Sequence, residues 1–132
     1  MDAVMPRILI VEDDDGLLKI IGEYLSAYSS EAELAGSAAQ ARNCLTRSNY
    51  DAVLSDFQMP DESGLDLLTH VKARYPGLPF ILMTGSHSSR LKDEAIKMGS
   101  SGYIEKPFRL KDLVETIETI PAPTDHGTGK LG

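Results

Sequence analysis

The sequence predicts an α/β domain built on a doubly wound parallel β-sheet. Short apolar segments alternate with amphipathic segments five times along the chain. The first apolar segment, residues 7–11, is almost continuously apolar, as a parallel strand buried on both faces should be. A length of 132 residues suits one compact domain with one core. Five strand–helix units at this spacing imply right-handed crossovers between parallel strands.

The first two units occupy the N-terminal third of the chain. After strand 7–11, a helix begins around Asp15 and places four apolar residues on one face: Leu17, Leu18, Ile21 and Leu25. Residues 31–36 form a weak second strand. Ser37 is a suitable N-cap for the alanine-rich helix that runs from there through Leu45.

The third and fourth strands cover residues 51–56 and 79–84. Between them, residues 60–63 form a turn. The helix that starts at Gly64 has apolar side chains on one face: Leu65, Leu68 and Val71. The sequence YPG at residues 75–77 ends that helix.

The last two helices flank the fifth strand, residues 101–106. A polar, loosely held helix over residues 88–98 is closed by Gly99. The final helix, residues 110–120, has its apolar residues at helical spacing and is followed by a segment with two prolines. The predicted organisation is an N-terminal extension, one domain, and a flexible tail or start of a linker, over residues 1–6, 7–120 and 121–132.

Composition excludes several classes of protein. The formal net charge of −7 disfavours direct binding of nucleic acid, because phosphates would be repelled. The apolar runs are too short to span a membrane, and the N-terminus has no secretory h-region, so a cytoplasmic location is expected. The single cysteine, Cys44, is predicted to be a packed small apolar residue. The histidines show no metal-ligand spacing and are predicted to lie on the surface: His70, His87 and His126.

Polar residues follow the predicted strands at one edge of the sheet. In doubly wound sheets the ligand site lies at the carboxyl ends of the strands. Glu12 and Asp13 end the first strand, Asp56 ends the third, Thr84 ends the fourth, and Lys106 follows the fifth. These five side chains are therefore expected to meet in one crevice.

The three acids in this crevice are expected to hold a divalent cation. Two unit charges about 4 Å apart repel by ~1 kcal/mol in water and by ~4 kcal/mol at an effective dielectric of about 20. Oxygen ligands without His or Cys favour Mg²⁺ over zinc or copper, with Mn²⁺ as a substitute. Asp14 and Asp15 have a different predicted role, because they lie where they can cap the first helix and favour its dipole.

Four motifs give the chain a resemblance to the receiver domain of two-component response regulators. They are ILIVEDDD, VLSDFQMPDESG, ILMTGS and GYIEKPF, in this order and each at a predicted strand end. The resemblance covers roughly residues 6–120. It implies a flavodoxin-like (βα)₅ fold with strand order 2-1-3-4-5. It also implies a place in a phosphorelay, with a histidine kinase or a histidine phosphotransfer protein as the phosphoryl donor.

The resemblance also implies roles for the residues in the crevice. Asp56 is similar to the phosphoacceptor, and Glu12 and Asp13 to the acidic pair that binds Mg²⁺. Gln58 would give the metal its backbone carbonyl. Lys106 would contact the phosphoryl oxygens, and its bond to the following proline would be cis.

A second group of residues concerns the response and its duration. Thr84 is similar to the hydroxyl that moves toward the new phosphoryl group, and Tyr103 to the aromatic switch residue. The side chains of Gln58 and Ser86 are expected to flank the path of the hydrolysing water and to tune its rate. Such a domain is a signalling phosphoacceptor that catalyses its own phosphorylation and dephosphorylation, rather than an enzyme acting on other substrates.

Three other functions compete with this interpretation. A phosphatase of the haloacid-dehalogenase type would also use Asp56 and Mg²⁺, but it needs a second acid where this chain has Gln58. A flavodoxin-like mononucleotide binder needs a phosphate-cradling loop after the first strand, where residues 12–15 would repel a phosphate. A degenerate receiver would only bind partners, but the signature positions are intact. The last helix lacks the arginine-bearing stretch typical of receivers in winged-helix transcription factors, so the dimer of that subfamily is not implied.

Overall fold

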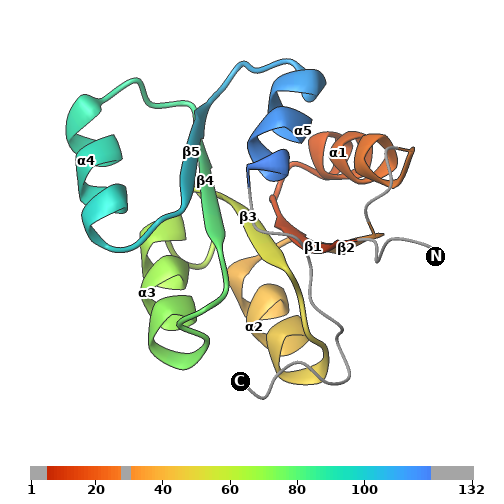
Figure 1. The fold of residues 1–132 in the computed structure, drawn as a ribbon, viewed down its shortest axis with the longest axis horizontal. Helices are drawn as coiled ribbons and strands as arrows, with labels where there is room; N and C mark the ends of the chain where they lie inside the picture. Colours follow the sequence, from red (N-terminus) through yellow and green to blue (C-terminus); the bar gives the residue numbers. More distant parts are fainter. Residues whose placement is uncertain (1–5, 28–30, 120–132) are drawn as a thin grey trace.

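The computed structural model describes residues 6–27 and 31–119, which form a five-stranded sheet with five helices around it (Figure 1). In chain order the elements are β1 (Arg7–Val11), α1 (Asp15–Ala27), β2 (Glu31–Ala35), α2 (Ala38–Arg47), β3 (Ala52–Asp56), α3 (Gly64–Arg74), β4 (Phe80–Thr84), α4 (Ser89–Lys97), β5 (Gly102–Glu105) and α5 (Leu110–Glu118). The predicted alternation of strands and helices is confirmed. Residue 120 and the predicted tail, with His126, lie outside the described residues.

The strands are all parallel and stand in the order β2-β1-β3-β4-β5, as the flavodoxin-like prediction requires. Val11 pairs with Ser55, Asp56 with Met83, and Thr84 with Glu105. This register brings the carboxyl ends of β1, β3, β4 and β5 together at one edge of the sheet. β2 lies on one side of β1, whereas β3 and the later strands lie on the other side. In a doubly wound fold the ligand crevice opens at this reversal of strand order, between β1 and β3.

The helices cover the sheet in two layers. α1 and α5 lie on one face, and α2, α3 and α4 on the other (Figure 1). Side chains alternate between the two faces, so that Ile8 and Ile10 pack under α1 and α5, whereas Leu9 and Val11 pack under α2 and α3. The central strands therefore contribute side chains to the apolar cores on both faces of the sheet.

Burial explains why one strand is weak in the sequence. All five residues of β3 and of β4 are buried, which accounts for the apolar runs at residues 52–54 and 80–83. In the edge strand β2 only Ala35 is buried, and Leu34 is an exposed apolar residue. α4 is held similarly loosely, because Ala95 is its single buried residue.

The predicted caps are confirmed at two helices, and a third helix has a cap that the sequence analysis did not predict. The Ser37 hydroxyl accepts a hydrogen bond from the amide of Gln40, and the Asp14 carboxylate accepts one from the amide of Leu17. Asp15 is the first residue of α1, where its charge favours the helix dipole. Ser63, predicted as part of a turn, is the N-cap of α3 in a capping box with Asp66.

None of the helices in the described part of the chain is long and apolar enough to cross a membrane. Cys44 is buried between apolar neighbours of α2, as predicted. His87 is exposed, also as predicted. The prediction for His70 is wrong in part, because this histidine is half-buried and its Nδ1 lies 3.0 Å from an Arg42 guanidinium nitrogen.

Candidate phosphoacceptor site

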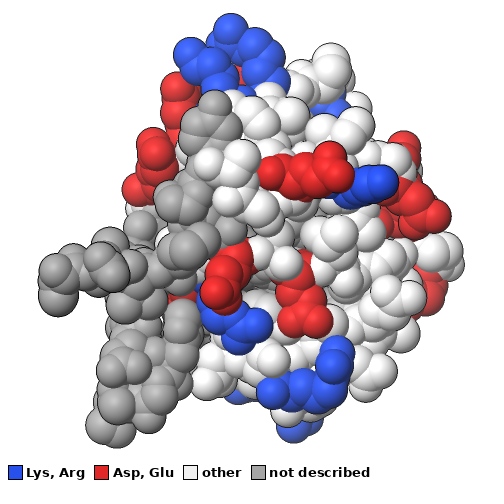
Figure 2. Space-filling view, turned by 90° about the vertical axis from the view of Figure 1, so that its right-hand side faces the viewer, with Lys and Arg blue, Asp and Glu red and all other residues white. Residues whose placement is uncertain are grey.

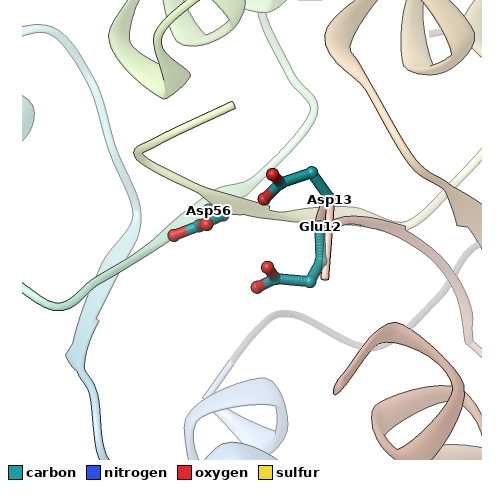
Figure 3. Close-up of side chains that lie close together, drawn as sticks. All are labelled: Glu12, Asp13 and Asp56. Carbon is teal, nitrogen blue, oxygen red and sulfur yellow. The ribbon is translucent and has the colours of Figure 1, made fainter. Parts of the chain in front are cut away.

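Three carboxylates meet at the carboxyl edge of the sheet (Figure 3). Glu12 and Asp13 follow β1, Asp56 is the last residue of β3, and one oxygen of each lies within 4.8 Å of the others. Glu12 is 1% exposed and Asp56 6% exposed, while Asp13 faces solvent. The sequence-based prediction that these acids converge is confirmed.

Lys106 joins the acidic cluster from the end of β5. Its Nζ lies 2.9 Å from Glu12 Oε1 and 3.3 Å from Asp56 Oδ1. The backbone positions it, because the Lys106 amide donates to the Thr84 carbonyl at 2.7 Å. The peptide bond between Lys106 and Pro107 is cis, as the resemblance implies. One ammonium group thus offsets part of the repulsion between two buried carboxylates.

The pKa values in this cluster move in directions that follow from burial and charge. Burial raises the pKa of the Glu12 carboxyl, and the Asp56 charge raises it further, against the hydrogen bond from Lys106. Burial alone would lower the pKa of Lys106. The hydrogen bond to Glu12 and the charges of Asp56 and Glu12 outweigh that effect, so its pKa is raised and the ammonium form is favoured.

Thr84 ends β4 next to Lys106, whose amide donates to the Thr84 carbonyl, and is 1% exposed. Its Oγ1 accepts a hydrogen bond from the amide of Ser86 at 3.0 Å, which ties the hydroxyl to the loop after β4. The Ser86 hydroxyl in turn accepts from the amide of Ser88 at 3.3 Å. A movement of Thr84 would therefore break a contact with the loop that leads into α4.

Tyr103 lies on β5, and its ring is half-buried against the core. The phenol oxygen is the one buried side-chain polar atom without a hydrogen-bond partner among the described residues. The Lys92 ammonium of α4 lies 6.0 Å from the ring centroid. Burial, and secondarily the Glu105 charge, raise the pKa of this phenol, so it remains protonated. A buried phenol without a partner can gain a hydrogen bond if the side chain moves.

The loop that carries Gln58 ends at Gly64, where α3 begins close to the end of β3. A Cβ at Gly64 would lie 2.5 Å from the Asp56 carbonyl oxygen and 2.9 Å from Leu82 Cδ1. The Gly64 amide donates to the Phe57 carbonyl at 2.7 Å. The first turn of α3 can therefore sit directly against the end of β3 only if residue 64 has no side chain. Gln58 lies in the loop between, with an exposed side chain.

The donor set of this cluster suits a hard divalent cation. It consists of carboxylate oxygens at short mutual distance, one of them solvent-facing, with no sulfur or imidazole ligand. Glu12, Asp13 and Asp56 are the side chains that would hold such an ion. A site with few protein ligands and an open side favours Mg²⁺, which keeps several waters.

Sequence reasoning missed the contacts that join residues far apart in the chain. It placed Lys106 in the crevice but not its ion pair with Glu12, 94 residues away. It also missed two acids of the loop after β3, Asp61 and Glu62, which bind α2. The sequence contains no periodic signal for such contacts, because they depend on how loops lie over a neighbouring helix.

Comparison with known proteins agrees with the geometry of this site. Residues 8–118 match the model of the response regulator receiver domain family. The response regulator protein FleR of Pseudomonas aeruginosa is 33% identical over 125 residues, which cover 95% of this chain and 25% of FleR. The transcriptional regulatory protein RprY of Bacteroides fragilis is 33% identical over 114 residues, which cover 86% of this chain and 48% of RprY. The chain thus spans between a quarter and a half of the length of these relatives.

Solved structures show the same likeness. The non-phosphorylated HemR receiver domain of Leptospira biflexa superposes with a TM-score of 0.84 at 31% identity, covering 91% of this chain and 97% of that one. A CheY-like receiver domain protein of Methanospirillum hungatei gives a TM-score of 0.83 at 30% identity, with 87% and 92% covered. These matches remove the support for the phosphatase alternative, and the chain belongs to the family of response regulator receiver domains.

Proposed function

We propose that this receiver domain accepts a phosphoryl group on Asp56 from a histidine kinase or a histidine phosphotransfer protein. The observation that carries the proposal is the setting of Asp56. Its carboxylate is almost fully buried, yet it lies beside one ammonium group and two further carboxylates. Burying a carboxylate beside other charged groups contributes little to stability, and such clusters are typical of reactive sites.

The reaction follows from these groups. An Asp56 carboxylate oxygen attacks phosphorus in line, the bond from phosphorus to the donor's nitrogen breaks, and an acyl phosphate forms. Lys106, already 3.3 Å from Asp56, holds a positive charge where the phosphoryl oxygens arrive. Glu12, Asp13, Asp56 and the Gln58 carbonyl would hold Mg²⁺, or Mn²⁺ in its place. The ion would supply neutralisation of charge on the transferred group.

The same site would catalyse loss of the phosphoryl group. Water must approach the acyl phosphate from the solvent side of the crevice, past side chains that follow the strand ends. Gln58 is exposed and Ser86 half-buried there, and neither is one of the side chains proposed to hold the ion or the phosphoryl group. These two residues would therefore set the lifetime of the phosphorylated state without being required for its formation.

Phosphorylation would change the surface formed by α4, β5 and α5. Thr84 would leave the Ser86 amide and bind the phosphoryl group, and Tyr103 would reorient on β5. α4 is the helix best suited to follow, because it buries a single residue. A partner that binds one of the two arrangements more tightly would read the change.

The remaining parts of the proposal concern the setting of the domain. Residues 7–120 would form the receiver domain, residues 1–6 an extension, and residues 121–132 a tail or the start of a linker. We place the protein in the cytoplasm, with its output in a further domain or a separate protein. On the face that carries α1, acidic and basic groups are interspersed (Figure 2). Together with the net charge of −7, this supports the absence of direct nucleic-acid binding.

The test of the proposal is covalent labelling. Incubation with Mg²⁺ and a small acyl phosphate should add one phosphate by intact mass, and Asp56→Asn should abolish the addition. Asp93→Asn, the same change on an exposed position of α4, is the control and should label like the parent. Undiminished labelling of Asp56→Asn would refute the assignment.

A further inference from the structure

The loop between β3 and α3, residues 57–63, is attached to α2 by two acidic side chains. The Asp61 carboxylate accepts hydrogen bonds from the amides of Ala38, at 3.2 Å, and Ala39, at 2.9 Å. These amides belong to the first turn of α2, so Asp61 caps this helix together with Ser37. Burial opposes the Asp61 charge, but the amide hydrogen bonds outweigh it and lower the pKa of this carboxyl.

Glu62 makes the second attachment. Its two oxygens accept three hydrogen bonds from the Arg42 guanidinium, at 3.0, 2.9 and 2.8 Å. The pair is half-buried, and the remaining Arg42 nitrogen, Nη1, lies 3.0 Å from His70 Nδ1 on α3. Arg42 therefore connects α2, the loop and α3 at once. A forked guanidinium can do this because its donors are held in one plane.

Gln58, the proposed backbone ligand, lies between these attachments and Asp56. Phe57 and Met59 pack on the core beside it. The part of the loop beyond them, residues 60–62, is held to α2 by the hydrogen bonds just described. Freed from α2, this part would sample more backbone conformations, and ordering it again around a cation would cost conformational entropy.

We propose that Arg42 is a positioning residue of the phosphoryl-transfer site: through Glu62 it holds the β3–α3 loop ready to complete the cation site. The proposal rests on the proposed function, because it takes the acidic cluster to be a Mg²⁺ site. Arg42 touches neither the acids of that cluster nor the phosphoryl group. It acts through the loop, and its loss should weaken Mg²⁺ binding.

Charge alone predicts the opposite result, which makes the proposal testable. Removing a cation from the neighbourhood of an acidic site strengthens its attraction for Mg²⁺. Arg42→Gln removes such a cation and also the forked contact with Glu62. Loss of charge alone would strengthen Mg²⁺ binding in this variant. Weaker binding would therefore show that the loop is no longer held in position.

The experiment is a titration of the protein with MgCl₂, followed by amide shifts of residues 12–14 and 56–64. We expect the dissociation constant of Arg42→Gln to rise about fivefold, somewhat below the effect of residues that orient a metal ligand directly. Arg42→Lys, which keeps the charge without the fork, should lie between the variant and the parent. Arg90→Gln, at an exposed position of α4, removes one positive charge without touching the β3–α3 loop, and it should not weaken Mg²⁺ binding. Without Mg²⁺, loop amides should exchange faster in Arg42→Gln than in the control.

The outcomes separate the two proposals. A parent protein that neither binds Mg²⁺ nor becomes labelled would refute the proposed function. A parent that binds Mg²⁺, with a folded Arg42→Gln that binds as tightly or more tightly, would overturn the role of Arg42 alone. If Arg42→Gln loses its fold, Arg42→Lys decides: weakened binding at unchanged charge supports the proposal, and parent-like binding overturns it.

Discussion

At the scale of single residues, three carboxylates and one ammonium group lie together at the strand ends, and their charges determine the repulsion in the site. Lys106 bonds Glu12 and approaches Asp56, while Asp13 faces solvent within reach of both acids. Lys106 offsets one charge, so the cluster keeps an excess of negative charge. Burial raises the pKa of the Glu12 carboxyl, and the Asp56 charge in this cluster raises it further.

The first prediction concerns Asp13→Asn. Removing this charge lowers the repulsion in the metal-free site, so the variant should be at least as stable as the parent in urea without Mg²⁺. The parent should gain ~1.4 kcal/mol at about ten times the Mg²⁺ dissociation constant, and the variant should lose this gain. A metal-free variant much less stable than the parent would instead assign Asp13 a capping role.

Gln58→Asn is the second prediction, and it concerns the lifetime of the phosphorylated state. Asparagine keeps an amide that can orient water and removes one methylene from its path. We expect dephosphorylation to accelerate roughly tenfold, equivalent to ~1.4 kcal/mol in the barrier. The measurement is the first-order decay of phosphorylated protein at constant Mg²⁺ after removal of the donor. Unchanged decay in both Gln58→Asn and Ser86→Ala would show that these positions do not control access of water.

At the scale of elements, α2 and α3 are joined through a neutral histidine. Burial lowers the pKa of His70, and the charges of Arg42 and Arg74 lower it further, against the opposing charge of Glu62. A neutral His70 can accept the hydrogen bond from Arg42 through Nδ1. A protonated His70 cannot, and it repels both arginines.

The third prediction follows from the sign of this shift. Because the pKa of His70 is lower in the folded state than in the unfolded chain, the unfolded chain binds the proton first as pH falls. The contribution to stability is present above about pH 6.5 and is lost as pH falls through the lower, folded pKa. Urea unfolding from about pH 7.5 to about pH 5 should show a larger loss of stability for the parent than for His70→Gln. Parallel losses in both proteins would contradict it.

The caps show which parts of an element can be predicted from sequence. Ser37 could be predicted because its partner amide is three residues away. The contribution of Asp61 to the same helix end could not, since 22 or 23 residues separate it from its partners. The site likewise combines contacts that sequence can predict with contacts that it cannot. The acids and Lys106 were predicted because they lie at or just after strand ends. The hydrogen bond between Lys106 and Glu12 was not, because it depends on the strand register and on side-chain conformations.

For the whole molecule, the fold was predictable because each strand inside the sheet contains a run of three or four apolar residues. The edge strand β2 was weak in the sequence for the same reason, since it buries one residue. The order of the strands followed from the family resemblance, and the register then placed the predicted site residues at one edge. The half-buried position of His70 was not predicted, because it depends on the approach of α2 to α3.

A prediction at this scale concerns the response to phosphorylation. Binding of beryllofluoride with Mg²⁺ should mimic the phosphoryl group and draw Thr84 away from the Ser86 amide. Amide shifts should then cluster over residues 84–111, because Tyr103 and the loosely packed α4 respond together. Lys97→Gln, at the far end of α4, should show the same pattern and serve as the control. Shifts confined to the loops around Asp13 and Asp56 would contradict a switch.

The two-layered packing also determines which apolar surface is exposed while the chain is being synthesised. The face under α1 and α5 combines Ile8 and Ile10 of β1 with Leu113 and Ile117 of α5, which the ribosome makes about a hundred residues later. The opposite face has all of its helices once α4 has emerged, and β5 then adds Tyr103 to it. A nascent chain that has produced β5 but not α5 therefore exposes the apolar part of this side that α5 covers, next to α1. During synthesis this side is the surface that chaperones would have to shield.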